Sequence, residues 1–130
     1  MSKKKLLRKS FLNKKIKLQK SNFNPDFYYI ISSSSSYITK KQLESCLRII
    51  SYYIRKSRRY FYTCLNFTIP ITKKPKFSRM GSGKGRIRKM VARIHMNSIL
   101  FIFKKTVDYT KLWKAFKAIQ HRLPVKIHLY

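Results

Sequence analysis

The sequence predicts an α+β fold in which two helices pack on a mixed, mainly antiparallel sheet. Apolar residues recur at helical spacing in two stretches, and runs of aromatic and β-branched residues typical of strands surround those stretches. With 130 residues, of which 44% are apolar, the chain has room for one domain with a modest core and a tail. A long basic loop that contains glycine interrupts the pattern in the middle.

Residues 1–25 are predicted to form a basic N-terminal arm that precedes a single domain over residues 26–130. Lysine and arginine dominate the arm, apolar residues are sparse, and Pro25 marks its end. Free in water, such a segment is expected to be disordered. A mitochondrial targeting peptide is a competing interpretation, although such peptides favour arginine over lysine.

The domain is predicted to open with a strand over residues 27–31, a serine linker over 32–36 and a helix over about 40–57. Thr39 and Gln42 have the spacing of a capping box, in which the Thr39 side chain caps the helix and Gln42 reaches back. The buried stripe of this helix is predicted to be Leu43, Cys46, Leu47, Ile50 and Ile54.

A strand over residues 60–67 and an irregular segment over 70–75 are predicted next. Strands over 87–94 and 99–103 are expected to form a hairpin, in which Asn97 takes a left-handed turn conformation. A second helix over about 109–122, capped by Asp108 or Thr110, leads to a last strand over 125–130. The buried face of that helix is predicted to be Leu112, Ala115, Phe116, Ile119 and Leu123.

The charge balance indicates the class of partner. Thirty-two Lys and Arg face three acids, which gives a net charge of +29. Internal ion pairs cannot neutralise this excess, so we expect a polyanionic partner, and nucleic acid is the first candidate. A lipid-binding or membrane-lytic protein is the alternative, although the longest apolar run, Ile99 to Phe103, is too short to span a bilayer.

Catalytic chemistry has little support in the sequence. The acids Asp26, Glu44 and Asp108 are far apart, so they offer no carboxylate cluster for metal-dependent catalysis. The two cysteines and three histidines have no metal-ligand spacing. We therefore predict no enzyme activity, no metal and no cofactor.

All three glycines lie within five positions, at Gly81, Gly83 and Gly85. The loop must therefore need backbone conformations or close approaches that a Cβ would block. A nucleotide-binding P-loop is disfavoured, because the spacing is wrong, Gly85 stands where Ser or Thr is needed, and a strand follows. A loop inserted into folded RNA explains more than a hairpin tip with solvated cations, since the cations pair with phosphates and Met80 offers an apolar contact.

The loop and its flanks closely resemble the signature of the bacterial-type large-subunit ribosomal protein family "L-sixteen". The matching residues are Pro70-Ile71-Thr72-x-Lys74-Pro75-x-x-x-Arg79-Met80-Gly81-x-Gly83-Lys84-Gly85. Further matches cover nearly the whole chain: Thr39-x-x-Gln42-Leu43-Glu44, Val91-Ala92, Ile99-Leu100-Phe101, Ala115-Phe116 and Leu123-Pro124-Val125-Lys126.

The resemblance implies a hammerhead-type α+β fold that binds large-subunit rRNA beside neighbouring ribosomal proteins, below the tRNA elbow. The loop over residues 79–89 would reach toward the peptidyl-transferase centre and the tRNA acceptor arms. In some members the arginine that matches Arg79 is modified. The family has no catalysis of its own, and neither membrane insertion nor an independent homo-oligomer is expected.

The residues expected to contact rRNA or tRNA lie in the glycine loop, on or after the first helix, or in the arm. They are Arg79, Met80, Gly81, Ser82, Gly83, Lys84, Gly85, Arg86, Arg88, Lys89, Lys73, Lys74, Arg48, Arg55, Arg58, Arg59, Lys3, Lys4, Lys5, Arg8, Lys9, Lys14 and Lys15.

The amino-acid composition bears on localisation. Lys, Ile, Phe and Tyr, which A/T-rich codons specify, are abundant. The chain also departs from the family where Ser32 to Ser36 replace the usual glycines and Met96-Asn97 replace Pro-Gly. These features predict a divergent member of a mitochondrial ribosome in the matrix, encoded in the organelle, with a plastid or the bacterial cytoplasm as alternatives.

Overall fold

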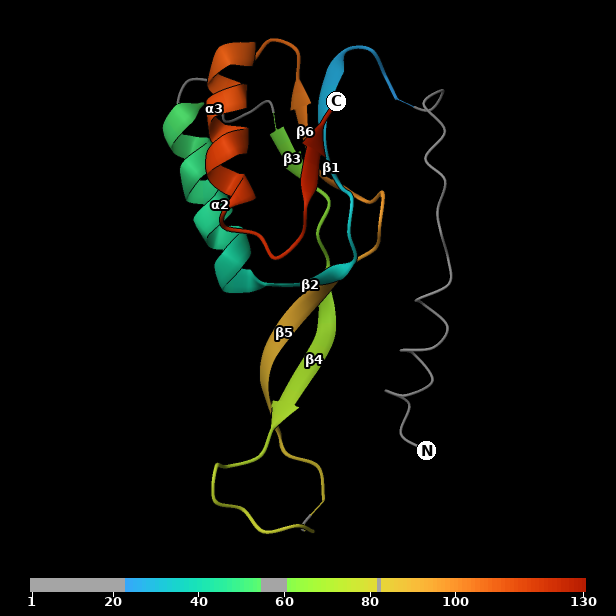
Figure 1. Cartoon of the computed structure of the whole chain (residues 1–130), viewed down its shortest axis with the longest axis vertical. Coiled ribbons are helices and arrows are strands. Elements are labelled where there is room, and N and C mark those ends of the chain that lie inside the picture. Colours follow the sequence, from blue (N-terminus) through green and yellow to red (C-terminus); the bar gives the residue numbers. More distant parts are fainter. Residues whose placement is uncertain (1–22, 55–60, 82) are drawn as a thin grey trace.

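The computed structural model describes residues 23–54, 61–81 and 83–130, and these form two helices and seven strands (Figure 1). The elements are β1 (Phe27–Ser32), β2 (Ser36–Thr39), α2 (Lys40–Tyr53), β3 (Phe61–Thr63), β4 (Phe67–Lys73), β5 (Arg86–Ile94), β6 (Ile99–Lys104), α3 (Tyr109–Gln120) and β7 (Ile127–Leu129). The predicted α+β class is confirmed.

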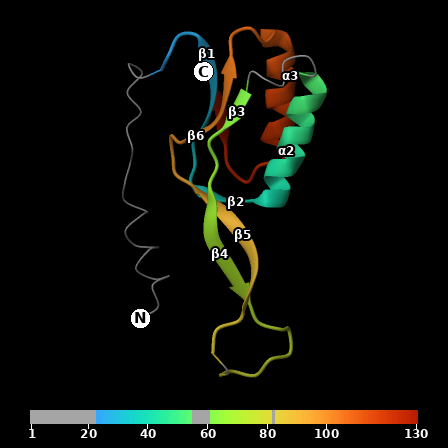
Figure 2. The ribbon, with the colours of Figure 1, turned by 180° about the vertical axis from the view of Figure 1, so that it is seen from behind.

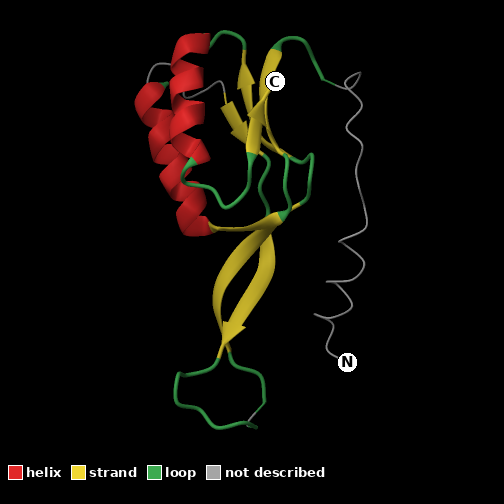
Figure 3. Cartoon of the chain, viewed as in Figure 1, coloured by secondary structure: helices red, strands yellow, loops and turns green. Residues whose placement is uncertain are grey.

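The strands form two sheets whose neighbouring strands are all antiparallel in the described residues. The four-stranded sheet has the order β3-β6-β1-β7, and the three-stranded sheet has the order β2-β5-β4. Helices α2 and α3 pack side by side on one face of the four-stranded sheet (Figure 3). From the far end of this body, β4 and β5 project as a twisted two-stranded ribbon that carries a loop at its tip (Figure 2).

The hydrophobic core lies between the four-stranded sheet and the two helices. Fully buried Ile30, Phe101 and Phe103 come from the sheet, and fully buried Ile50 and Ile119 come from the helices. The predicted stripe of α3 is buried as expected, Leu123 included, whereas in α2 Leu43 and Leu47 are only partly buried. The two amphipathic faces explain why these segments are helical, since both enter one core, to which Ile38 of β2 and Ala92 and Ile94 of β5 also contribute.

The capping box of α2 is confirmed. The Thr39 backbone N–H donates to Gln42 Oε1 at 2.9 Å, and the Gln42 N–H donates to Thr39 Oγ1 at 3.4 Å. The helix ends at Tyr53 rather than near residue 57, and Ile54 is its C-cap. Asp108 is the N-cap of α3, but its side chain caps no amide and instead pairs with Lys111 Nζ at 2.7 Å.

The predicted serine linker is confirmed only over residues 33–35. Ser32 ends β1 as a buried residue whose Oγ donates to the His95 carbonyl at 2.6 Å, and Ser36 begins β2. Between them, Ser34 Oγ accepts from the Lys126 N–H at 3.0 Å, and Ser35 Oγ accepts from the Met96 N–H at 2.9 Å. The serines therefore satisfy backbone groups where the chain passes from one sheet to the other.

The predicted strand over 60–67 and irregular segment over 70–75 are also corrected. β3 covers only Phe61–Thr63, and β4 runs from Phe67 to Lys73, straight through Pro70. β4 is an edge strand of its sheet, where a residue without an N–H is tolerated.

The predicted hairpin between 87–94 and 99–103 is wrong, although both strands exist. β5 pairs with β2 and β4, whereas β6 pairs with β1 and β3. Asn97 does take the left-handed conformation, with φ of 65°, and its N–H donates to the Ser32 carbonyl at 2.7 Å. The turn thus moves the chain between sheets, and the long hairpin of the protein is β4–β5.

The predicted boundary between an arm and a domain near residue 25 stays a prediction, because residues 1–22 lie outside the described residues.

Candidate nucleic-acid interface

The β4–β5 ribbon positions the glycine loop. Its strands pair from Phe67 opposite Ala92 to Lys73 opposite Arg86. At the root of the ribbon, Val91, Ala92 and Ile94 are buried in the body, whereas β5 is exposed from Arg86 to Met90. The ribbon is therefore anchored at one end and holds the loop clear of the body at the other (Figure 1).

The prediction that the loop needs glycine is confirmed at each of the three positions. Gly81 and Gly83 have φ of 106° and 71°, a region that residues with a Cβ rarely adopt. A Cβ on Gly85 would lie 2.7 Å from the carbonyl carbon and oxygen of Lys73 on the opposite strand. The first two glycines shape the tip of the loop, and the third closes its neck.

Hydrogen bonds inside the loop hold it open as a ring. Lys74 Nζ donates to the Gly81 carbonyl across the loop. The Ser78 N–H and Oγ both donate to the Pro75 carbonyl, at 3.3 and 3.1 Å, and form a turn. The ring and its neck border a hollow of about 640 Å³, which is lined by Lys73, Lys74, Pro75, Ser78, Gly81, Lys84, Gly85, Arg86, Ile87 and Arg88.

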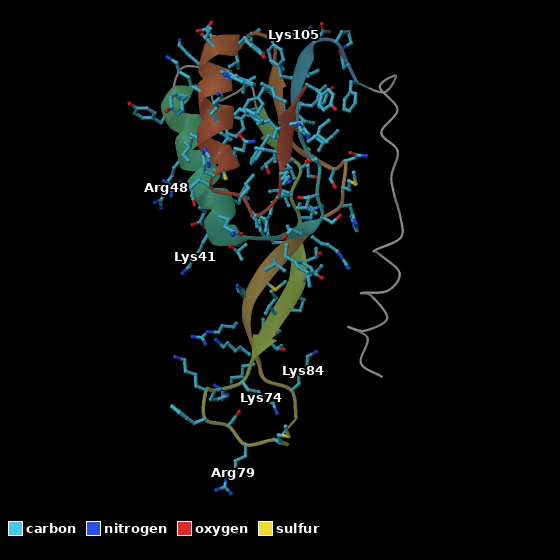
Figure 4. All side chains as sticks on the ribbon, viewed as in Figure 1. Lys41, Arg48, Lys74, Arg79, Lys84 and Lys105 are labelled. Atoms are coloured by element: carbon cyan, nitrogen blue, oxygen red, sulfur yellow. The ribbon has the colours of Figure 1, made fainter. Side chains whose placement is uncertain are left out.

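The loop and the end of the ribbon carry only positive charge. No acid occurs in the sequence between Glu44 and Asp108. Arg79 extends from the outermost part of the loop away from the body, while Lys74 and Lys84 lie nearer the neck (Figure 4). Several cations thus line one hollow with no carboxylate nearby in the sequence, an arrangement suited to phosphate.

The structure divides the predicted contact residues into two described groups. Lys73, Lys74, Arg79, Met80, Gly81, Gly83, Lys84, Gly85, Arg86, Arg88 and Lys89 gather on the loop and the outer half of the ribbon. Arg48 lies on the exposed surface of α2, well away from the loop (Figure 4). Outside the described residues lie Ser82, Arg55, Arg58, Arg59, Lys3, Lys4, Lys5, Arg8, Lys9, Lys14 and Lys15.

Two exposed loop residues, Lys76 and Phe77, were not among the predicted contacts. Phe77 is 98% exposed, and together with the fully exposed Met80 it makes the tip apolar as well as cationic. The available signal was an aromatic residue between cations, in a segment with neither helical nor strand spacing. Such a ring has no core to enter and can stack on a base or pack on a sugar.

The described part of the chain contains no group of three or more His, Cys, Asp or Glu placed to hold a metal ion. No helix in it has the length and apolar character to cross a membrane. Burial raises the pKa of the Cys46 thiol to about 11, against a smaller opposing effect of Arg122, and also raises the pKa of the exposed Cys64.

Comparison with known proteins identifies the family. The chain matches the family described as ribosomal protein L16p/L10e over residues 2–130. It is 31% identical to the large ribosomal subunit protein uL16 of Phytoplasma australiense over 100 residues, which cover 76% of this chain and 71% of that protein. It is 32% identical to uL16 of Corynebacterium glutamicum (strain R) over 102 residues, which cover 78% and 72%. The chain belongs to the ribosomal protein L16p/L10e family, whose members are structural, non-enzymatic components of the large ribosomal subunit.

Proposed function

We propose that the chain binds large-subunit rRNA and that its loop, residues 79–89, reaches toward the peptidyl-transferase centre and the tRNA acceptor arms to support tRNA positioning. The observation that carries the proposal is the β4–β5 ribbon, which holds a glycine-shaped ring away from the body, and all the charged side chains of this ring are cationic. Family membership supports the ribosomal setting.

The loop would bind RNA in two ways. Lys73, Lys84 and Arg86 at the hollow and Arg79 at the tip pair with phosphate oxygens, which fixes the position of the ribbon on the RNA. Phe77 and Met80 present apolar surface to a base or a sugar. With both kinds of contact, the narrow β4–β5 ribbon and its loop can enter folded RNA, where the broader body would collide with the RNA backbone.

The rest of the proposed interface comprises Arg48 on α2 and, outside the described residues, the cations of residues 55–59 and of the basic arm. These cations would bridge further RNA helices, next to neighbouring ribosomal proteins. With contacts on both the loop and the body, the protein would hold separate RNA segments together. Catalysis at the peptidyl-transferase centre belongs to the RNA.

Salt dependence of rRNA binding tests the proposal. Each phosphate contact releases counterions, so the logarithm of the affinity should fall linearly with the logarithm of the salt concentration, by roughly 0.7 to 0.9 per contact. Arg79→Ala should reduce the slope by about one contact, whereas the control Tyr62→Ala, on the exposed side of β3, should leave it unchanged. A shallow slope, or saturable binding to anionic vesicles without RNA, would favour the alternative of a cationic lipid-binding protein.

We also propose, on the amino-acid composition alone, that the protein works in a mitochondrial ribosome. The relatives named above are bacterial. Fractionation of the source cells tests this. The protein should sediment with the large subunit from purified mitochondria, and recovery from plastid or cytoplasmic ribosomes would correct the compartment.

A further inference from the structure

Helix α3 carries two aromatic side chains that the core does not use. Tyr109 and Trp113 lie one turn apart and are 53% and 41% exposed, and Lys117 follows one turn later. This stripe lies on the flank of α3 opposite Ala118, which lines a hollow between α3 and α2. The buried face of α3 is complete without the stripe.

The rings of the stripe are held in place by their neighbours. The centroids of Tyr109 and Trp113 lie 6.5 Å apart with an interplanar angle of 19°, and those of Trp113 and the buried Phe116 lie 5.4 Å apart at 24°. Tyr109 also contacts Tyr28 of β1, at 5.7 Å between ring centroids. The indole therefore packs on the buried Phe116, while Trp113 stays 41% exposed.

Exposed lysines lie over these rings. Lys117 Nζ lies over the Trp113 ring, 5.4 Å from its centroid, and Lys105 Nζ lies over the Tyr28 ring, 6.0 Å from its centroid. A base that stacks on Trp113 takes the place of the Lys117 ammonium group on the ring. The nearest acid in sequence, Asp108, is paired with Lys111 at 2.7 Å. A flat apolar partner with attached negative charge fits this surface, and an unpaired nucleotide has that chemistry: its base stacks on the rings and its phosphate meets the lysines.

We propose that Tyr109, Trp113, Lys105 and Lys117 form an aromatic platform on which unpaired RNA bases stack. The proposal rests on the proposed rRNA binding and adds a second contact with a different mode of recognition. Lys105 and Arg79 lie at opposite ends of the molecule (Figure 4), so one chain would hold RNA at the platform and at the loop simultaneously. A protein neighbour is the competing occupant.

Trp113 provides its own reporter, because it is the only tryptophan of the chain. The full-length protein is titrated with oligoadenylate and with an RNA duplex carrying the same number of phosphates, while tryptophan emission and the anisotropy of labelled RNA are recorded together. We expect the single strand to quench Trp113 emission along the binding curve and the duplex to bind with little quenching. Binding of oligoadenylate without a change in emission would overturn the platform.

Variants separate stacking from charge. Trp113→Ala should weaken oligoadenylate binding by about 5- to 100-fold, the effect of losing one stacked base, without changing the salt slope. Trp113→Phe should restore most of the affinity, and Lys117→Gln should reduce the slope. Tyr62→Ala removes an equally exposed ring, 51% exposed on β3, and should have no effect.

The outcomes distinguish the two proposals. If Trp113→Ala binds like Tyr62→Ala while the salt slope stays steep, the platform is refuted and rRNA binding through the loop stands. If no RNA binds, both proposals fall. Circular dichroism shows whether Trp113→Ala is folded. If it is misfolded, the test rests on the emission of the wild-type protein and on the folded Trp113→Phe and Lys117→Gln variants. Wild-type emission that oligoadenylate leaves unchanged, together with an unchanged salt slope in Lys117→Gln, overturns the platform.

Discussion

Gly85 shows how one residue controls the shape of the loop. Its Cα faces the backbone of Lys73 and Lys74 so closely that an added Cβ would lie 2.7 to 2.8 Å from their atoms. Backbone atoms cannot rotate away as a side-chain end can, so the two strands would have to separate at the neck. Gly83, by contrast, has open space around it and needs only its positive φ.

We therefore predict that Gly85→Ala opens the neck of the loop without unfolding the body. Amide hydrogen exchange should speed up for the last residues of β4 and the first of β5, while the melting temperature falls by only a few degrees at most, because the loop lies outside the core. Gly83→Ala is the matched control. It should cost roughly 1 kcal/mol in local backbone strain at the positive φ and should leave the neck of the loop closed. Unchanged exchange at Lys73 and Arg86 in Gly85→Ala would contradict the geometry.

Cys46 gives a residue-scale prediction about pH. Its pKa rises from 9.0 to about 11 in the fold, because burial disfavours the thiolate. An unfolded chain ionises this thiol above pH 9, whereas the folded chain keeps it protonated until about pH 11. Its contribution to stability is therefore complete below pH 9 and is lost as the pH rises from 9 to 11.

Urea unfolding of the wild type and of Cys46→Ala across this range measures that contribution, since the lysines and tyrosines common to both cancel. The free-energy difference between the two proteins should shrink as the pH rises. Parallel stability curves would contradict a buried neutral thiol at position 46.

At the scale of elements, the two helices begin in different ways. Thr39 caps α2 through its side chain, whereas Asp108 makes no such bond and pairs with Lys111 in an exposed position. Thr39→Ala should therefore lower the free energy of unfolding by about 1 kcal/mol. Asp108→Asn should lower it by about 0.5 kcal/mol or less, because an exposed ion pair contributes little. Chemical denaturation compares the two, and equal losses would contradict this account of the helix starts.

Local sequence signals predicted the elements whose stability is local or amphipathic. The capping box at Thr39, the stripes of both helices and the left-handed Asn97 were all readable, because each depends on residues a few positions apart. The same holds for the glycine loop, whose three special positions required a residue without a Cβ.

Elements that depend on distant partners were not readable. β2 is short, with only Ile38 buried, and it exists because β5 pairs with it some 50 residues later in the chain. β4 includes Pro70, which reads as a strand breaker until its position at a sheet edge is known. Likewise, nothing local revealed that the turn at Asn97 joins two sheets, since adjacent strands with a short turn normally form a hairpin.

At the scale of the whole molecule, the residues that stabilise the fold and the residues proposed to contact RNA lie in different parts. The core between the sheets and the helices stabilises the body, and the β4–β5 ribbon carries the loop beyond it. The net charge of +29 cannot be neutralised within the chain, which supports the proposed binding to RNA. Loop and body should respond independently to mutation, because they share only the root of the ribbon.

The central claim is that the loop tip contacts the RNA of the peptidyl-transferase region, and cross-linking from position 79 tests it most directly. A photoreactive residue replaces Arg79 in assembled large subunits, with position 62 on β3 as the control. Cross-links from position 79 should map to peptidyl-transferase rRNA and to the acceptor arm of bound tRNA, and those from position 62 should map elsewhere. Cross-links from position 79 only to peripheral rRNA or to proteins would contradict the account.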